Sequence, residues 1–494
     1  MPAIPAIPPM SPVPPVPPVS PASSAAPSPV PRRRAAVRAL LGVLSGTVVA
    51  AAVAAGAGAA GVAVTMAESY PSPPRAAHPE PWPQAAPVPP GRTVVAVVLG
   101  ATGSVTGDVL APYEVFARSP RFAVYTVAAA REPVALSGGL HALPDRTFAE
   151  VEARAAPAPD VVVVPAVTDP RGARESRTRE WIARQAGRGA RILGVCAGSD
   201  LLAAAGVLDG RRATSFWQRI GALEKSDPAV RWVRGLRYVQ DGPVTTTAGV
   251  TSGIVGALRL VEELAGLAEA GRVGREVAYP GWSPRGPVEI PVNGLTLSDL
   301  PYGLNAAFPW GRPSVGIGLP EGVGEIDAAA AFEVYSGTSF AARTVPVAGT
   351  RTVRTRHGMI LLAEPAGVRT AAVDRLVVPG ARHAEEAGPR LAAWAAERGL
   401  EMELPHRGRV AGESGFDGVL RDLAAHADLA TARTTAKFAE YPAAHLELTG
   451  AAWPWRPTAL AVLSLAAAAG FGVLAGKRMN TLIDMGSRML KPNR

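Results

Sequence analysis

Hydrophobic residues along the chain fall into two kinds of segment, and the longest of them are uninterrupted. Residues 39–67 and 457–476 form runs of 29 and 20 consecutive uncharged, mostly apolar residues. At 1.5 Å per residue, each run is long enough to cross a hydrocarbon layer of about 30 Å as a helix. The pattern therefore predicts transmembrane helices over 39–67 and 456–476. A cleaved secretory signal is the alternative for the first run, because basic residues precede it and small residues end it.

Shorter apolar runs alternate with amphipathic segments from residue 93 onward. Runs of four to six apolar residues predict buried strands, and the segments between them have helical spacing, as in 108–118 and 176–187. The strands expected on this basis are Val94–Leu99, Ala123–Ala128, Val161–Val164 and Ile192–Val195. Strands that alternate with helices indicate an α/β fold with a doubly wound, flavodoxin-like parallel sheet.

The same order of motifs returns 213 to 219 residues later. The nearly constant offset predicts two tandem modules of one fold between the two transmembrane helices, although chance matches in an alanine-rich chain are the competing explanation. The matching pieces are Asp108–Phe116 with Asp327–Tyr335, Val163–Pro165 with Val377–Pro379, and Trp181 with Trp394. In the second copy the segment Leu400–Gly408 has no cysteine or serine in a glycine-flanked turn. We therefore expect that copy to lack a nucleophile.

Composition completes the predicted domain organisation. Thirteen prolines in the first 31 residues predict a tail without fixed structure, and a second proline-rich stretch predicts a stalk. The predicted segments are a cytoplasmic tail (1–38), a transmembrane helix (39–67), the stalk (68–91), a first module with the cysteine (92–271), a connector (272–311), a degenerate second module (312–450), a second transmembrane helix (456–476) and a basic cytoplasmic tail (477–494).

The net charge of +9 is concentrated at the two ends of the chain. Residues 1–38 carry +4 and residues 477–494 carry +4, which leaves +1 for everything between them. By the positive-inside rule, both termini are expected in the cytoplasm and the modules outside it, in a two-pass protein of the cell membrane. The basic charge therefore indicates how the chain is oriented in the membrane. It does not indicate nucleic-acid binding, which needs a basic face on a folded domain. Abundant alanine, glycine, arginine and proline suggest a bacterium with a GC-rich genome.

Cys196 is the single cysteine of the chain and follows an apolar strand. The small neighbours Gly194, Ala197 and Gly198 predict a sharp strand-to-helix turn, a nucleophile elbow. A thiol at a helix N-terminus is stabilised as thiolate, so we expect its pKa below the usual value of about 8.5. The alternative is that a lone cysteine is a small buried hydrophobe.

Five pieces of residues 93–271 resemble the PfpI/ThiJ superfamily, which has the class I glutamine-amidotransferase-like fold, and look closest to its isonitrile hydratases and AraC-type sensor domains. These pieces are Asp108–Phe116, Ser137–Asp145, Val195–Ser199, Ala205–Thr214 and Thr247–Gly253. The resemblance implies that Cys196 is the reactive residue and that Asp108, after the first strand, bonds to it. It also implies oxyanion and elbow positions at Ala197, Gly198 and Gly139. Asp108 has a second reading as a helix N-cap.

The chain departs from this family at Phe216, where many members have a histidine. The usual imidazole base is therefore missing, and His141, the one histidine of the first module, holds a position that is not catalytic in the family. Chemistry by a thiolate and a carboxyl alone remains compatible with the sequence.

Two classes of function stay open. The first is a membrane-anchored cysteine-dependent hydratase or hydrolase that acts on a small electrophile. The second is a non-catalytic ligand sensor or scaffold of the same family. We expect a lipid membrane and an unknown small molecule as partners, pairing of the two modules or a homodimer, and no nucleic acid. The seven histidines are scattered without zinc-site spacing, so neither a metal nor a cofactor is expected.

Overall fold

The computed structural model describes residues 30–72, 81–366 and 372–489. Residues 1–29 of the predicted tail (1–38) lie outside the described residues. Two units are distinguished by their internal contacts, 54–466 and, among the described residues, 30–53 with 467–489.

The larger unit contains a seven-stranded sheet built from residues 93–247. Its strands run in the order β10-β11-β7-β6-β1-β2-β5, and neighbouring strands are parallel except for β10 and β11. The strand bounds are β1 Thr93–Val98, β2 Phe122–Ala128, β5 Arg146–Thr147, β6 Val161–Val164, β7 Arg191–Gly194, β10 Tyr238–Asp241 and β11 Val244–Thr247. The fold is thus mixed α/β with parallel sheets, as the alternation predicted.

Helices cover both faces of this sheet because both faces are apolar. Along β1, Val95 and Val97 face one core, while Val94, Ala96 and Val98 face another. Such uninterrupted apolar strands are typical of parallel sheets buried on both sides. The helices of this half are α2 Thr106–Ala117, α3 Phe148–Glu152, α4 Ser176–Gly187, α5 Gly198–Ala204, α6 Trp217–Ser226, α7 Ser252–Ala265 and α8 Leu267–Val277.

A second, five-stranded sheet is built from residues 314–403, and all its strands are parallel. Its order β18-β17-β12-β13-β16 matches β7-β6-β1-β2-β5 of the first sheet. The bounds are β12 Ser314–Gly318, β13 Arg343–Ala348, β16 Glu364–Pro365, β17 Arg375–Val377 and β18 Met402–Glu403, with helices α9 Leu300–Ala307, α10 Glu325–Phe332, α11 Pro389–Glu397, α12 Gly415–His426 and α13 Leu429–Ala439.

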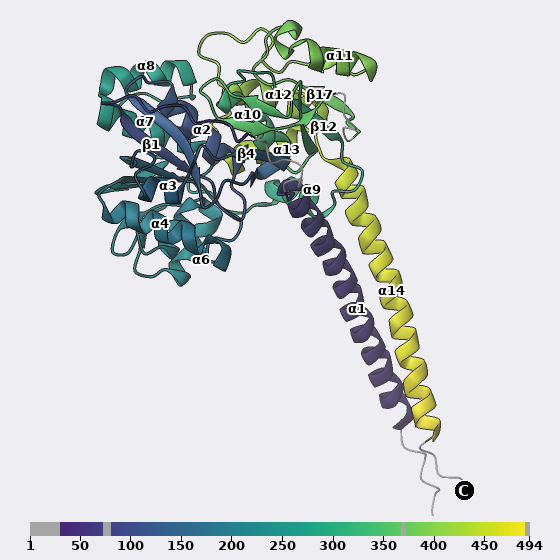
Figure 1. Cartoon of the computed structure of the whole chain (residues 1–494). Helices are drawn as coiled ribbons and strands as arrows, with labels where there is room; N and C mark the ends of the chain where they lie inside the picture. Colours follow the sequence, from purple (N-terminus) through teal and green to yellow (C-terminus); the bar gives the residue numbers. More distant parts are fainter. Residues whose placement is uncertain (1–29, 73–80, 367–371, 490–494) are drawn as a thin grey trace, which may run out of the picture. The chain divides into compact units, whose positions relative to one another are not determined.

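The two halves share one core and one small sheet. Helices α2, α7 and α8 of the first half and α10, α12 and α13 of the second contribute to a single hydrophobic cluster between the two large sheets (Figure 1). A four-stranded antiparallel sheet, β14-β15-β4-β3, takes two strands from each half, with the bounds β3 Val134–Leu136, β4 Leu140–Leu143, β14 Thr352–Arg354 and β15 Ile360–Leu362. A short pair, β8 Arg212–Ala213 and β9 Arg231–Trp232, completes the strands of the described residues.

Two glutamates cap the facing helices reciprocally. The carboxylate of Glu114, on α2, accepts a hydrogen bond from the backbone N–H of Ile326 in the first turn of α10 (2.5 Å). The carboxylate of Glu333, just after α10, accepts one from the backbone N–H of Gly107 in the first turn of α2 (3.0 Å). The first N–H groups of a helix have no partner within the helix, so each half satisfies donors of the other.

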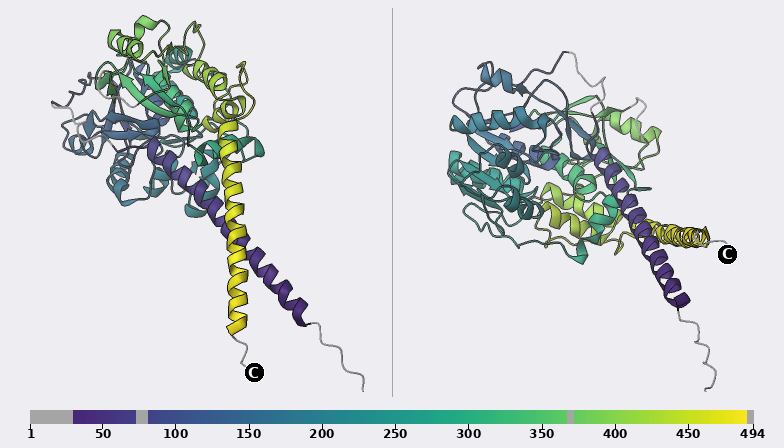
Figure 2. Two further views of the ribbon diagram at one scale, coloured as in Figure 1. Left: turned by 90° about the vertical axis from the view of Figure 1, so that its right-hand side faces the viewer. Right: turned by 90° about the horizontal axis from the view of Figure 1, so that it is seen from below.

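Two helices, α1 Val30–Ser69 and α14 Trp455–Met489, are long and apolar enough to cross a membrane. Both exceed the predicted spans, because α1 begins at Val30, within the predicted tail, and α14 continues past residue 476 into the predicted basic tail. The two helices cross (Figure 2). They come close at glycines, where a Cβ on Gly46 would lie 2.7 Å from the carbonyl oxygen of Gly472. Small residues that allow such close backbone contact are typical of packed membrane helices.

The reciprocal caps predict a loss of stability when one glutamate is removed. Glu114→Ala leaves the buried N–H of Ile326 without an acceptor and should lower the free energy of unfolding by about 1–3 kcal/mol. Guanidinium unfolding of the detergent-solubilised full chain, followed by tryptophan fluorescence, measures this loss. Glu397→Ala, at an exposed position of α11, is the matched control and should change stability by less than about 0.5 kcal/mol. Equal effects of the two substitutions would contradict the cap.

Candidate functional site

Cys196 lies in a strained turn between β7 and α5. Its φ of 54° is in the left-handed region, which a non-glycine residue occupies only when surrounding contacts hold it there. The backbone N–H of Cys196 donates to the Thr247 hydroxyl (3.3 Å), and the Ser199 hydroxyl donates to the Cys196 carbonyl (3.1 Å). A Cβ on Gly198 would lie 2.2 Å from the carbonyl oxygen of Val164, so only glycine fits there. These contacts give the local shape of a nucleophile elbow.

Asp108 lies in the first turn of α2 and is fully buried. Its Oδ2 accepts a hydrogen bond from the backbone N–H of Ala166 (3.0 Å), whereas Oδ1 has no hydrogen-bond partner among the described residues. The helix N-cap position is Val105, and among the described residues the Asp108 side chain accepts no hydrogen bond from its own helix, so Asp108 is not an N-cap. Burial, together with the charge of Glu333, raises the pKa of Asp108 well above its usual range. Burial therefore favours the protonated form of this carboxyl.

The thiol of Cys196 has a raised pKa, opposite to the expectation from the sequence. Burial is the largest cause, and the charges of Asp108, Glu440 and Glu333 act in the same direction, whereas the N–H of Ala197 only partly offsets them. The prediction of a lowered pKa is wrong because only 5% of the Cys196 surface is exposed, so desolvation outweighs the helix N-terminus. The resting site holds a neutral thiol.

Of the oxyanion and elbow positions inferred from the family, Ala197 lies beside the sulfur but Gly139 does not contact it among the described contacts. Ala197 follows the cysteine directly, and its N–H favours the thiolate form. Gly139, with φ of 81°, packs instead against the second half, where a Cβ would lie 3.3 Å from the carbonyl oxygen of Thr344. Its neighbour Ser137 is the polar residue of this turn, because its hydroxyl donates to Glu333 (2.7 Å) and accepts from the N–H of Thr106 (2.8 Å).

Aromatic side chains from both halves lie beside the elbow. The ring of Phe438 stacks on Tyr302 (4.1 Å between centroids) and contacts Trp217 (5.3 Å) and Phe216 (6.3 Å). Phe216 packs against the core that contains Cys196, and the charge of Cys196 acts on the hydroxyl of Tyr302. The surroundings of Cys196 therefore include both an aromatic wall, formed by Phe216, Tyr302 and Phe438, and carboxyl groups.

Tyr70 was missed by sequence reasoning, although it follows α1 directly. Its hydroxyl is buried, and its pKa is raised by that burial and by the charges of Glu333, Asp108 and Cys196. Its ring packs on Gly103, where a Cβ would lie 2.8 Å from the ring, and lines a cavity of about 500 Å³ together with Thr102 and Arg177. His141 holds the same segment, since its Nε2 lies 2.9 Å from the carbonyl oxygen of Pro71.

The second half places a different set of side chains at the equivalent point of its sheet. Asp327 lies in the first turn of α10, and His406 follows β18 as Cys196 follows β7. His406 Nδ1 accepts from the N–H of Gly380 (2.8 Å), and Arg409 donates to Asp327 (2.7 Å). Against the effect of burial, His406 and Arg409 lower the pKa of Asp327.

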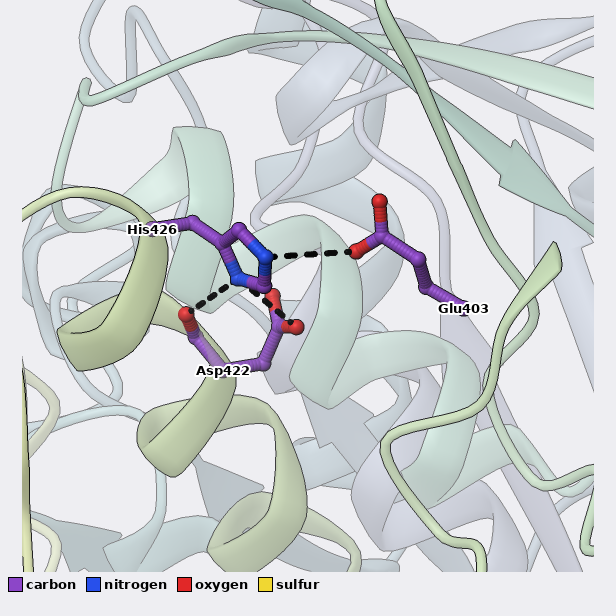
Figure 3. A group of neighbouring side chains, drawn as sticks. All are labelled: Glu403, Asp422 and His426. Atoms are coloured by element: carbon purple, nitrogen blue, oxygen red, sulfur yellow. Dashed lines mark hydrogen bonds and ion pairs between the residues drawn. The ribbon is translucent and has the colours of Figure 1, made fainter. Parts of the chain in front are cut away.

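One cluster of the described residues has the ligand types of a metal site. Glu403, Asp422 and His426 place one ligand atom each within 4.8 Å of one another (Figure 3). However, the guanidinium of Arg375 already forms ion pairs with Glu403 and with Asp422 (3.0 Å to the latter). The positive charge of Arg375 therefore already neutralises these carboxylates. The cluster is a structural ion-pair network.

Comparison with known proteins gives matches to the first half of the chain. The DJ-1/PfpI family matches residues 94–263. An isonitrile hydratase of Pseudomonas putida is 34% identical over 179 residues, 35% of this chain and 72% of that protein. The HTH-type transcriptional regulator CdhR of Pseudomonas aeruginosa is 36% identical over 107 residues, 22% of this chain and 32% of the regulator.

Solved structures are similar to a little more than a third of the chain. A ThiJ/PfpI family protein from Pseudomonas syringae is 30% identical with a TM-score of 0.35, covering 39% of this chain and 78% of that one. Drosophila melanogaster DJ-1beta is 23% identical with a TM-score of 0.32, covering 37% and 97%. Residues 94–263, which match the family, contain Cys196 and Asp108, and with the 34% identity to a hydratase over 72% of its length the chain belongs to the DJ-1/PfpI family.

Proposed function

We propose that this protein is a membrane-anchored enzyme of the DJ-1/PfpI family in which Cys196 adds to a small neutral electrophile with a carbon–nitrogen multiple bond. The proposal is carried by the strained elbow of Cys196 together with the buried Asp108, whose charge acts on the thiol and whose Oδ1 has no hydrogen-bond partner among the described residues. A buried acid beside a thiol can deliver a proton as the sulfur attacks. The similarity to an isonitrile hydratase suggests an isonitrile or a related substrate.

The surroundings of the sulfur favour an uncharged substrate. The charges of Glu333 and Glu440 act on the thiol, so an anionic ligand would be repelled. The aromatic wall of Phe216, Tyr302 and Phe438 offers apolar contact instead. A small apolar molecule with one reactive carbon satisfies both conditions.

The proposed addition balances without any further reagent. The sulfur of Cys196 bonds to the isonitrile carbon, that carbon takes the proton of Asp108, and the thiol proton replaces it on Asp108. The product is a thioimidate, R–N=CH–S–Cys196. Addition of water to the same carbon and loss of the thiol then release the formamide R–NH–CHO.

We also propose that residues 312–450 are a degenerate second copy of the module, which pairs with the first and completes its site. Three observations support this: the shared strand order, the equivalent positions of Asp108 and Asp327, and the reciprocal glutamate caps. In this proposal, loss of the cysteine freed the second copy to supply packing and carboxylates. A homodimer is not needed for that role.

A ligand sensor is the second candidate function. It is favoured by the 5% exposure of Cys196 and by Phe216, which replaces the histidine expected from the family. In this reading the cavity beside Tyr70 would bind a small molecule, and the neutral thiol would only pack.

The enzyme proposal predicts turnover that depends on the elbow. The full chain in detergent should convert n-butyl isonitrile to N-butylformamide, and Cys196→Ser should abolish this conversion. Asp108→Asn should lower it by about 100-fold or more, the usual size of a general-acid contribution. Gas chromatography of the product measures it, with Asp209→Asn, at an exposed position, as the matched control. Saturable binding without product would support the sensor.

The raised thiol pKa predicts the pH dependence of alkylation. Iodoacetamide should modify Cys196 with a midpoint above about 8.5, because burial disfavours thiolate. Asp108 ionises before the thiol in such a titration, so Asp108→Ala removes a repelling charge and should lower the midpoint. Mass spectrometry of the intact protein from pH 6 to 11 gives the rates. A midpoint at or below 8.5 that rises in Asp108→Ala would contradict this electrostatic account.

Membrane anchoring through α1 and α14 predicts a defined topology, with both termini in the cytoplasm and the modules outside. The support is the basic charge that flanks the two apolar helices. In a Cys196→Ser background, an impermeant maleimide applied to intact cells should label Arg285→Cys but not Pro5→Cys. After the cells are permeabilised, both should be labelled. Labelling of position 5 alone in intact cells would reverse the topology.

A further inference from the structure

Building on the proposed function, we infer that Glu440, contributed by the second half of the chain, is the base that accepts the proton of the attacking water at Cys196. The first half supplies no imidazole for this step, because Phe216 stands where many relatives have histidine. The end of α13 meets the same segment, since Phe438 lies 6.3 Å from Phe216 between ring centroids. Glu440 is two residues beyond Phe438.

The backbone holds Glu440 firmly in position. Its φ of 52° is left-handed, as expected of a helix C-cap, where glycine or asparagine is usual. Its carbonyl oxygen accepts from the Thr251 hydroxyl (3.0 Å), from Arg237 (3.3 Å) and from the Tyr279 hydroxyl (3.3 Å). These bonds from the first half hold the strained residue in place.

The cap geometry alone does not require a carboxylate. Helix α8 of the first half ends in the same way, at Ala278, with a left-handed φ of 55°. A methyl group is sufficient there, so the longer acidic side chain of Glu440 serves another purpose. That side chain is directed into the first half, where it is buried.

The carboxylate of Glu440 reaches the surroundings of the elbow. One oxygen, Oε2, accepts from the N–H of Gly249 (2.6 Å) and from the Ser252 hydroxyl (3.3 Å), at the start of α7. Glu440 also lines a cavity of about 20 Å³ with Ser215, whose hydroxyl donates to the carbonyl of Cys196 (3.3 Å). A cavity of this size has room for about one water molecule.

The electrostatic surroundings suit a base that works near neutral pH. Burial raises the pKa of Glu440 to about 7, although Gly249, Ser252 and the cation of Arg237 act in the opposite direction. The other titratable groups that face it are Tyr279, which follows α8, and Cys196, whose pKa the charge of Glu440 raises. A base is most effective when its pKa lies near the working pH.

The proposed hydrolysis returns Cys196, Asp108 and Glu440 to their starting protonation states. Water oxygen bonds to the thioimidate carbon while one water proton passes to Glu440 and the nitrogen takes the proton of Asp108. The tetrahedral intermediate then forms its carbonyl, the hydroxyl proton returns to Asp108, and the carbon–sulfur bond breaks. The departing sulfur takes the proton held by Glu440, and the formamide leaves.

The test compares Glu440→Gln with the unmodified full chain in detergent, with n-butyl isonitrile as the probe. In the unmodified protein kcat should rise with pH through about 7, as Glu440 ionises. In Glu440→Gln, kcat should fall about 100-fold or more, the rise near pH 7 should be lost, and intact-protein mass should show Cys196 carrying one molecule of probe. Glu447→Gln, at an exposed position nearby, should behave like the unmodified protein.

Unfolding separates catalysis from folding, because the amide oxygen of glutamine can accept the bonds from Gly249 and Ser252. Glu440→Gln should therefore keep the thermal unfolding midpoint at pH 5. A normal rise of kcat near pH 7 in Glu440→Gln would overturn the assignment while leaving the enzyme proposal intact. If the unmodified protein shows no turnover, the enzyme proposal fails instead. In that case, a pH midpoint of Cys196 alkylation that is unchanged in Glu440→Gln would also reject the placement of Glu440 beside the sulfur.

Discussion

The reciprocal bonds between Glu114 and Ile326 and between Glu333 and Gly107 are the constraint on which the rest of the site depends. They tie the first turns of α2 and α10 together, and Asp108 lies in the first of these turns. Because unpartnered helix N–H groups are costly when buried, neither helix can move away from the other without losing an acceptor. The position of the acid beside Cys196 is therefore fixed by the second half of the chain as much as by its own.

Two related aspartates show how neighbours decide the protonation of a buried acid. Asp108 has a single backbone donor and a nearby glutamate, so burial dominates and favours the protonated form. Asp327 is also buried, but Arg409 and His406 lie beside it and favour the ionised form. Similar backbone positions thus hold an acid in one half and an ion pair in the other.

Local elements could be predicted from the sequence, whereas long-range contacts could not. The bounds of α4 and β6 agree with expectation, and β1, β2 and β7 agree within one or two residues, since each is an apolar or amphipathic run with clear ends. The elbow at Cys196 was also predicted from its small neighbours. The pKa of its thiol was not, because it depends mainly on burial in the folded chain and also on the charges of Glu440 and Glu333, more than 130 residues away. Pairing of β4 with β15 likewise leaves no local pattern.

The position of Tyr70 means that the first residue chosen for a soluble fragment changes the chemistry of the site. Family similarity begins at residue 94, so a fragment designed from it would start after α1 and would lack this side chain. The buried place of the tyrosine hydroxyl, near Ser137, Glu333 and Asp108, would then be open to solvent through the cavity that its ring lines. Water there would stabilise the ionised forms of both acids and of the thiol. Reactivity measured on such a fragment would describe a hydrated site that the intact chain does not contain.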